Sequence, residues 1–154
     1  MRPPLLLLLA LLSALATACA GSRPAEHLDH HDQRQGRWRT YYDDARTQLF
    51  TQGRYRHGQP VGRWRYYDHT GHLQRRERYR HHGFSDITCY YPNGRVARQG
   101  RARVVEEPSG LHFYWLGEWQ YYSPAGTLDS VQTYALGQRL GTRYLTENRM
   151  QPGK

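Results

Sequence analysis

Apolar and aromatic residues alternate with polar residues along much of the chain, which is the pattern of a β-strand with two different faces. In the stretch 62–71, Trp64 and Tyr66 stand at positions of one parity. The positions of the other parity hold Arg63, Arg65 and Tyr67. Since residues of one parity lie on one face of a strand, we expect Trp64 and Tyr66 on one face and the arginines on the other.

The same spacing recurs along the chain. Gly62 is followed by Trp two residues later, by Tyr three residues after that, and by Gly after four more. The positions equivalent to Trp64 are Trp38, Ile87 and Trp119, which gives intervals of 26, 23 and 32 residues. Self-similarity at such a period indicates a repeat architecture of four copies.

Each copy is expected to form a β-hairpin. Asn93-Gly94 is a strong signal for a tight hairpin turn, and a Gly-containing turn stands at the same place in two other copies, at 68–71 and 123–126. The segments 55–62 and 134–141 match in five positions, which predicts a closing strand from Gly141 through Tyr144. The long third interval predicts an insertion within 104–111, with a loop at 106–110.

Few aliphatic residues remain outside the first 18 positions, so Tyr and Trp rings must supply most of the packing. Repeats of this kind pack only on their neighbours. The sequence therefore predicts an all-β fold, an elongated twisted antiparallel meander of β-hairpin repeats in a single-layer sheet of about nine strands. The repeats are expected over 36–146, followed by a polar tail at 147–154.

The first 18 residues have the features of a secretory signal peptide, namely Arg2, an apolar run over 5–16 and the small-residue triplet before Cys19. Ala-Thr-Ala-Cys resembles the lipobox of bacterial lipoproteins. That resemblance implies acylation of Cys19, anchoring to a membrane by lipid, and a place in the bacterial cell envelope. Ordinary cleavage without a lipid is the alternative. The polar residues 19–35 are predicted to be a flexible tether.

The chain has a formal net charge of +9, carried almost entirely by arginine. A basic surface attracts anionic partners. An exported protein rarely meets nucleic acid, so we expect a protein or an anionic envelope component instead. The simpler alternative is that arginine only fills the polar positions of the strands. The candidate binding surface comprises Arg63, Arg65, Tyr67, Arg75, Arg76, Arg78 and Arg80.

The sequence suggests no catalytic residues, and we expect a protein without enzymatic activity. The acids Glu106, Glu107, Glu118 and Asp129 do not have the spacing of a known site. Residues 27–32 include side chains that bind metals, but their spacing defines no site, so neither a metal nor a cofactor is expected. Cys89 is interpreted as a packing residue.

The repeat residues resemble the MORN-repeat family, and more closely its bacterial variant, the YwqK-type antitoxin-like proteins. The copies beginning at Gly62 and Gly117 fit the pattern Gly-x-Trp-x-x-Tyr-x-x-x-Gly-x-Leu as far as Leu73 and Leu128. The third copy departs from it through Ser85, Ile87 and Ala102. The resemblance covers about residues 36–146 and implies a row of β-hairpins that acts as a binding or scaffolding surface.

Two functions remain open from the sequence. The first is a lipid-anchored binding scaffold that presents arginine and tyrosine to a protein or an envelope polymer. The second is an antitoxin or immunity protein that neutralises a partner toxin. A neighbouring toxin gene would favour the second.

Overall fold

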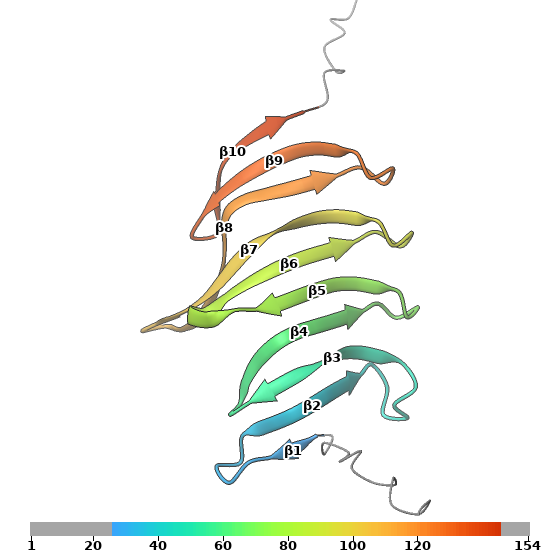
Figure 1. Ribbon diagram of the computed structural model, residues 1–154, viewed down its shortest axis with the longest axis vertical. Coiled ribbons are helices and arrows are strands. Elements are labelled where there is room, and N and C mark those ends of the chain that lie inside the picture. Colours follow the sequence, from blue (N-terminus) through green and yellow to red (C-terminus); the bar gives the residue numbers. More distant parts are fainter. Residues whose placement is uncertain (1–25, 146–154) are drawn as a thin grey trace, which may run out of the picture.

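The computed structural model describes residues 26–145 and shows one open antiparallel sheet whose strands follow the order of the chain (Figure 1). This confirms the all-β meander of hairpins. The strands are β1 His27–Leu28, β2 Arg34–Tyr41, β3 Leu49–Arg56, β4 Gln59–Tyr67, β5 Leu73–Tyr79, β6 Phe84–Tyr90, β7 Val96–Glu107, β8 Gly110–Tyr122, β9 Leu128–Ala135 and β10 Gln138–Tyr144. A short 3₁₀ turn, η1 His81–Gly83, joins β5 to β6. Within the described residues, no helix is long and apolar enough to cross a membrane.

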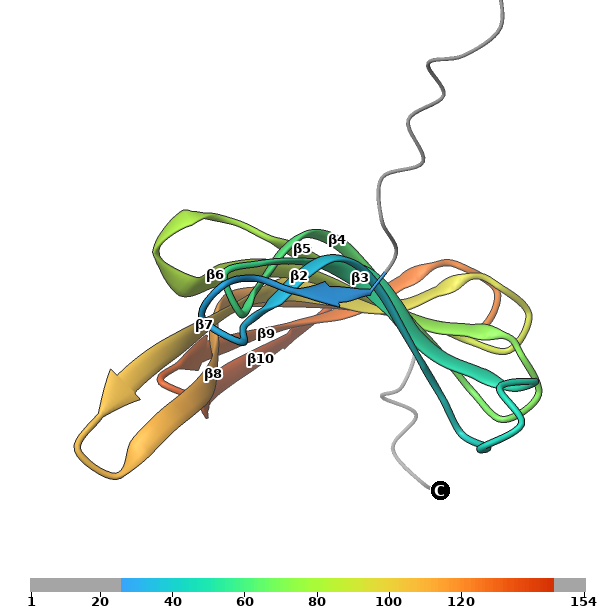
Figure 2. The ribbon, with the colours of Figure 1, turned by 90° about the horizontal axis from the view of Figure 1, so that it is seen from below.

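The sheet is bent as well as twisted. Figure 2 shows the ends of the hairpins curving towards one side, so the two faces of the single layer differ in shape. The hairpins β2–β3, β4–β5, β6–β7 and β8–β9 are the four predicted repeats, and β10 is the predicted closing strand.

The sheet begins earlier in the chain than the sequence indicates. The tether expected over 19–35 includes β1, whose residue His27 pairs with Gln35, and β2 already begins at Arg34. Only two residues of β1 pair, which is too few to produce a visible alternation of polar and apolar positions. The signal peptide, Cys19 and the tail at 147–154 lie outside the described residues.

The insertion lies where the sequence predicts it but has a different form. Instead of a loop over 106–110, β7 and β8 extend to 12 and 13 residues and meet at a turn made by Pro108 and Ser109. Glu106 pairs with Leu111 across this extension. Most of the polar residues that the sequence assigns to a loop are therefore strand residues, because the ladder of backbone hydrogen bonds continues through them to the turn.

Bulges occur at regular places in the sheet. Each hairpin has one extra residue in its second strand just after the turn, at Phe50, Gln74, Ala97 and Asp129. Between repeats, Gly53 of β3 faces the three residues 62–64 of β4, and Gly100 of β7 faces the three residues 117–119 of β8. The junction between β5 and β6 has no such shift. Extra residues bend and twist a sheet locally, so these positions shape both faces.

The core lies on one face of the sheet, which we call the aromatic face because Trp64, Tyr66, Trp119 and Tyr134 project from it. Trp119 is fully buried and packs with Ile87 and Ala102. Trp115, from the extended part of β8, stacks on Trp119 with ring centroids 3.9 Å apart. The third copy lacks two aromatic rings at Ile87 and Ala102, and packing there comes from the neighbouring repeat.

Candidate binding face

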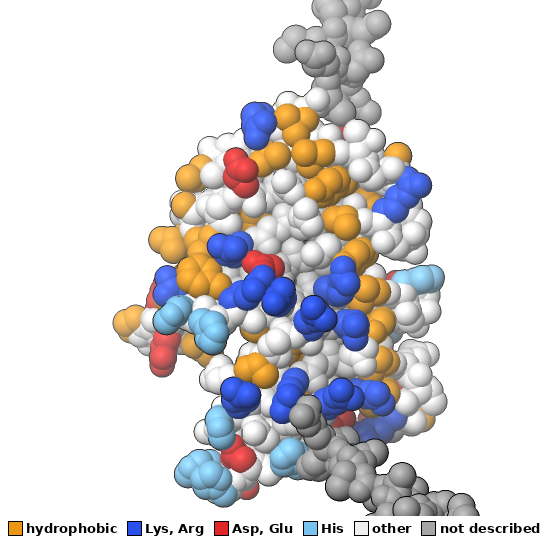
Figure 3. All heavy atoms as spheres, in the orientation of Figure 1, with side chains coloured by type: hydrophobic (Ala, Val, Ile, Leu, Met, Phe, Trp, Pro, Cys, Tyr) orange, Lys and Arg blue, Asp and Glu red, His pale blue; other side chains and the backbone are white. Residues whose placement is uncertain are grey.

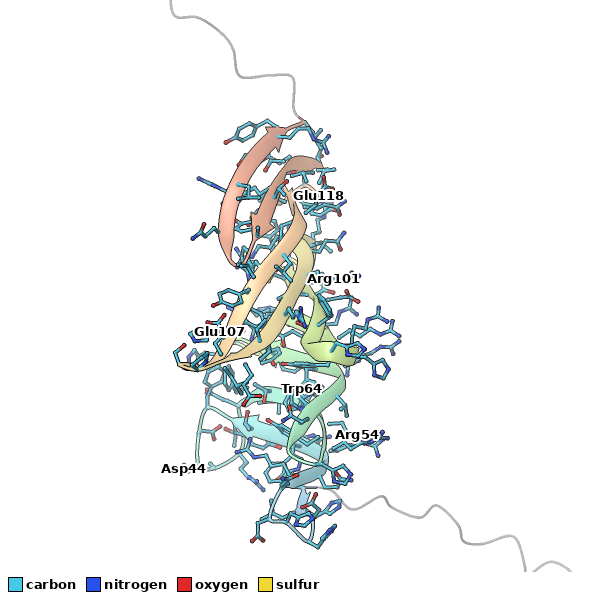
Figure 4. All side chains as sticks on the ribbon, turned by 90° about the vertical axis from the view of Figure 1, so that its left-hand side faces the viewer. Asp44, Arg54, Trp64, Arg101, Glu107 and Glu118 are labelled. Carbon is cyan, nitrogen blue, oxygen red and sulfur yellow. The ribbon has the colours of Figure 1, made fainter. Side chains whose placement is uncertain are left out.

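Arginines project from the side of the sheet opposite to the aromatic face, which we call the arginine face. Strand pairing places on it the exposed side chains of Arg37, Arg39, Arg54, Arg63, Arg65, Arg76, Arg78, Arg101 and Arg103. Figure 3 shows this concentration of basic side chains over the middle of the sheet. In Figure 4, Arg54 and Arg101 point to one side, and the strand ends near Asp44 and Glu107 bend to the other.

Five of the seven predicted surface residues lie on this face. Arg63 and Arg65 come from β4, and Arg76 and Arg78 stand opposite them on β5. Tyr67 is half-buried, and its hydroxyl oxygen accepts a hydrogen bond from Nε2 of Gln52 at 2.7 Å. The period-2 pattern of the sequence thus assigned Arg63, Arg65 and Tyr67 to the correct side of β4, and the strand pairing adds Arg76 and Arg78.

The other two predicted residues are occupied elsewhere. Arg75 lies on the aromatic face, where its Nε is 3.2 Å from Oε1 of Glu77 and its guanidinium lies 4.0 Å from the centroid of the Tyr66 ring. Arg80 follows β5, and its Nη2 is 2.6 Å from Oδ2 of Asp86. Arg75 and Glu77 stand two residues apart on β5, so their side chains lie on the same face. This spacing could have indicated that Arg75 does not belong to the arginine face.

Three pairs of arginines stand directly opposite one another on neighbouring strands. They are Arg37 with Arg54, Arg63 with Arg78, and Arg65 with Arg76. Like charges in directly opposed positions destabilise a sheet. Within residues 26–145, no carboxylate oxygen lies within 4.0 Å of a nitrogen of these six side chains. The face therefore carries unneutralised charge that an anionic partner would compensate.

Two shallow hollows lie on the arginine face, one at each of the large bulges. The basic hollow, of about 980 Å³, contains Gly53 and six arginines, among them Arg54 and Arg65. The mixed hollow, of about 640 Å³, contains Gly100 with Asp86, Arg101 and Glu118. At each bulge a tryptophan ring lies over the glycine on the aromatic face.

Asp86 is the carboxylate that neutralises part of this face. Its oxygens lie 2.6 Å from Arg80 and 3.3 Å from Arg101. Partial burial opposes ionisation of the Asp86 carboxyl, but the two guanidinium groups outweigh it and lower its pKa below the ordinary value. The β5–β7 part of the face is therefore less positive than the β2–β4 part.

The aromatic face contains one buried carboxylate, that of Glu77. The hydroxyl groups of Tyr66 and Tyr79 donate hydrogen bonds to its Oε2 at 3.1 and 2.7 Å. Burial raises the pKa of Tyr79, and the negative charge of Glu77 raises it further. This cluster satisfies a buried charge within the sheet and does not reach the arginine face.

The His-rich segment 27–32 is divided by the fold. His27 belongs to β1, while a carboxylate oxygen of Asp29 accepts hydrogen bonds from the backbone N–H groups of His31 and Gln33. Nδ1 of His57 is 3.0 Å from the other Asp29 oxygen. Among the residues placed in the structure, no three His, Cys, Asp or Glu side chains gather in a way that could hold a metal ion.

Sequence reasoning missed five arginines of this face: Arg37, Arg39, Arg54, Arg101 and Arg103. A signal for two of them was present, because Arg37 and Arg39 flank Trp38 just as Arg63 and Arg65 flank Trp64. An arginine that stands an odd number of residues from the tryptophan of its strand lies on the arginine face. This rule extends the predicted surface from one repeat to the next.

One hairpin of the sheet matches a known protein family. Residues 60–81 match the family model described as a MORN repeat variant, and these residues cover β4 and β5. No curated protein and no solved structure matches the chain. The hairpin of β4 and β5 is therefore similar to a MORN repeat of the variant type, and it lies in a sheet of hairpins with the same turn-side bulge.

Proposed function

We propose that this chain is a non-catalytic binding scaffold of the bacterial cell envelope, held on a membrane by acylated Cys19 and binding an anionic partner through its arginine face. The observation that carries the proposal is the direct opposition of Arg63 with Arg78 and of Arg65 with Arg76. Repulsion between them costs stability in the free protein. An anionic partner that bridges both guanidinium groups of a pair reverses that cost, because guanidinium binds carboxylate and phosphate through two hydrogen bonds.

The lipid anchor in this proposal rests on the sequence before residue 26. The signal-peptide pattern and the lipobox-like Ala-Thr-Ala-Cys19 support it. The start of the sheet at His27 leaves only a short segment between Cys19 and the sheet. A domain tied so closely to a membrane would meet partners at the envelope surface.

Binding is tested by pull-down of envelope components with the full chain. Charge reversal of Arg63, Arg65, Arg76 and Arg78 to Glu should abolish capture. A matched control makes four charge reversals away from the arginine face, with Arg34→Glu, Arg95→Glu, Arg98→Glu and Arg139→Glu. Capture that survives the fourfold change, or that is lost equally in the control, contradicts the proposal.

Anchoring is tested by the intact mass and membrane partitioning of the wild type and of Cys19→Ser. A mass increase that matches acylation, lost together with membrane retention in the variant, supports the anchor. An unmodified protein that does not partition to membranes would contradict the anchor while leaving the binding role of the arginine face to its own test.

A further inference from the structure

Hydrogen-bond donors form a continuous row across seven strands of the arginine face. Strand pairing joins each member directly to the next, from β2 to β8. This donor row consists of Arg39, Gln52, Arg65, Arg76, Thr88, Gln99 and Gln120. At about 4.8 Å between neighbouring strands, the row is roughly 29 Å long and perpendicular to the strands.

The row passes through both hollows of the face. Arg39, Gln52 and Arg65 line the basic hollow, and Thr88, Gln99 and Gln120 line the mixed hollow. Arg76 lies between the two sets, paired with Arg65 on one side and with Thr88 on the other. The two depressions therefore follow a single line of side chains that can hydrogen-bond to a ligand.

The chemistry of the row changes along its length. Its β2–β5 part contains three guanidinium groups, and its β6–β8 part contains only a hydroxyl and two amides. Guanidinium groups bind anionic groups, whereas amides and hydroxyls donate to and accept from uncharged hydroxyl groups. A ligand that uses the whole row therefore carries both acidic groups and uncharged hydroxyl groups.

Tyrosines form a second row beside the first. One stands two residues after a donor-row member in each hairpin, and all four are half-buried. This tyrosine row is Tyr41, Tyr67, Tyr90 and Tyr122. Nε2 of Gln99 donates to the Tyr122 hydroxyl at 3.0 Å, and the Arg76 guanidinium lies 5.2 Å from the Tyr90 ring centroid. The donors and the rings therefore form one connected surface.

We propose that the two rows bind a linear acidic polysaccharide that crosses the strands from β2 to β8. This inference rests on the proposed function and names the class of its partner. Sugar hydroxyls match the amides and the threonine, acidic substituents match the arginines, and tyrosine rings offer apolar surface to the C–H faces of sugar rings. The repeat places a tyrosine on every second strand, which suits a ligand whose own units repeat.

The test is isothermal titration calorimetry of the full chain in neutral detergent, with oligomers of polygalacturonate as the probe. Dextran of matched length and oligothymidylate serve as the neutral polymer and the nucleic-acid alternative. Polygalacturonate should bind, and dextran should bind much more weakly. Equal binding of dextran, or tighter binding of oligothymidylate, would overturn the assignment to an acidic polysaccharide.

A variant with unchanged net charge distinguishes binding along the donor row from binding by general electrostatic attraction. Thr88→Val with Gln99→Leu leaves the net charge unchanged but removes hydrogen bonds to sugar hydroxyls, so affinity should fall on the order of tenfold. The matched control is Thr142→Val with Gln132→Leu, which makes the same changes on the aromatic face, where Thr142 and Gln132 pair. Arg76→Gln is a second row variant, at an exposed side chain that forms no ion pair with the described residues.

The outcomes distinguish this inference from the proposed function. If Thr88→Val with Gln99→Leu and Arg76→Gln each bind polygalacturonate as the wild type does, the polymer path along the row is wrong. If the fourfold Arg→Glu variant still captures its envelope partner, the arginine face itself is not the binding surface. Thermal unfolding of every variant verifies that a loss of binding is not a loss of fold.

Discussion

The indole ring of Trp119 lies directly over Gly100 of the neighbouring strand. A Cβ atom built at Gly100 would be only 2.3 Å from Cδ2 of Trp119, and Nε1 of Trp119 donates a hydrogen bond to the carbonyl oxygen of Arg101 at 3.1 Å. Trp64 has the same relationship to Gly53, at 2.1 Å, with Nε1 directed to the carbonyl oxygen of Arg54. Each tryptophan therefore needs a glycine in the preceding strand.

A methyl group at these glycines should destabilise the sheet. Gly100→Ala or Gly53→Ala places Cβ inside the ring of a tryptophan that cannot move without losing its hydrogen bond and its packing. Overpacking of this kind typically costs about 1–3 kcal/mol, and the very short distances here favour the upper end. Urea unfolding of each variant gives the change in free energy of unfolding.

Gly141→Ala is the matched control, because no heavy atom lies within 4 Å of a Cβ built there. Gly100→Ala should be much less stable than Gly141→Ala, and equal stability would refute the steric argument. Adding Trp119→Ile to Gly100→Ala should recover part of the loss relative to the sum of the single changes.

The third repeat shows how the tryptophan and the glycine that faces it can change together. At its junction Ile87 replaces tryptophan, and the facing residue of the preceding strand is Glu77 rather than glycine. With a smaller residue in the slot, the neighbouring strand can carry a side chain, and the two strands pair without a bulge. The departures at Ser85 and Ile87 were visible in the sequence, but their consequence for the register was not.

The repeat spacing was sufficient to predict the hairpins, the turns and the faces of Arg63, Arg65 and Tyr67. It could not predict which glycines receive a tryptophan ring, because Gly53 and Gly100 lie outside the repeated motif. Nor could it predict the donor row, since pairing Arg39 with Gln52 or Thr88 with Gln99 requires the register between strands. Bulges set that register, and they depend on packing between repeats.

Removal of the Trp119 side chain should be more damaging than removal of Trp38. Trp119 is fully buried and stacks on Trp115, whereas Trp38 is half-buried near the edge of the sheet. Loss of a buried tryptophan costs about 3–5 kcal/mol, so Trp119→Ala should approach that range. Denaturant unfolding of the two variants provides the comparison, and a larger effect of Trp38→Ala would contradict the location of the core.

Stability should decrease in alkaline solution because of Tyr66 and Tyr79. Burial raises the pKa of both hydroxyls above 10.0, and Glu77 adds to the shift. In the unfolded chain these tyrosines lose their protons near pH 10, while in the folded sheet they keep them. Stability is therefore fully present below about pH 10 and falls as pH rises further, because the unfolded state then binds fewer protons.

Urea midpoints measured below and above about pH 10 test this expectation. Tyr79→Phe should show a weaker alkaline loss than the wild type, because the group with a raised pKa is gone. Tyr144 is 74% exposed on the edge strand, so Tyr144→Phe serves as the control and should leave the pH profile unchanged. An alkaline loss that is identical in wild type and Tyr79→Phe would exclude Tyr79 as its cause.

Charge reversal at one arginine should stabilise the protein while weakening its binding. Arg63 stands directly opposite Arg78, so Arg63→Glu replaces repulsion with an ion pair and should raise the free energy of unfolding by about 0.2–1 kcal/mol. The same change removes positive charge from the arginine face and should weaken capture of an anionic partner. Denaturant unfolding and pull-down are measured on the same preparation.

Arg75→Glu provides the opposite case on the aromatic face. Arg75 contacts the carboxylate of Glu77 and the ring of Tyr66, so its reversal places two carboxylates together and should destabilise the sheet. Binding by the fraction that remains folded should be unchanged, because Arg75 lies on the other side. A gain of stability with a loss of binding in Arg63→Glu would indicate that the opposed arginines are kept for a partner and not for the fold. A loss of stability in Arg63→Glu would instead mean that these arginines support the sheet and need no ligand to explain them.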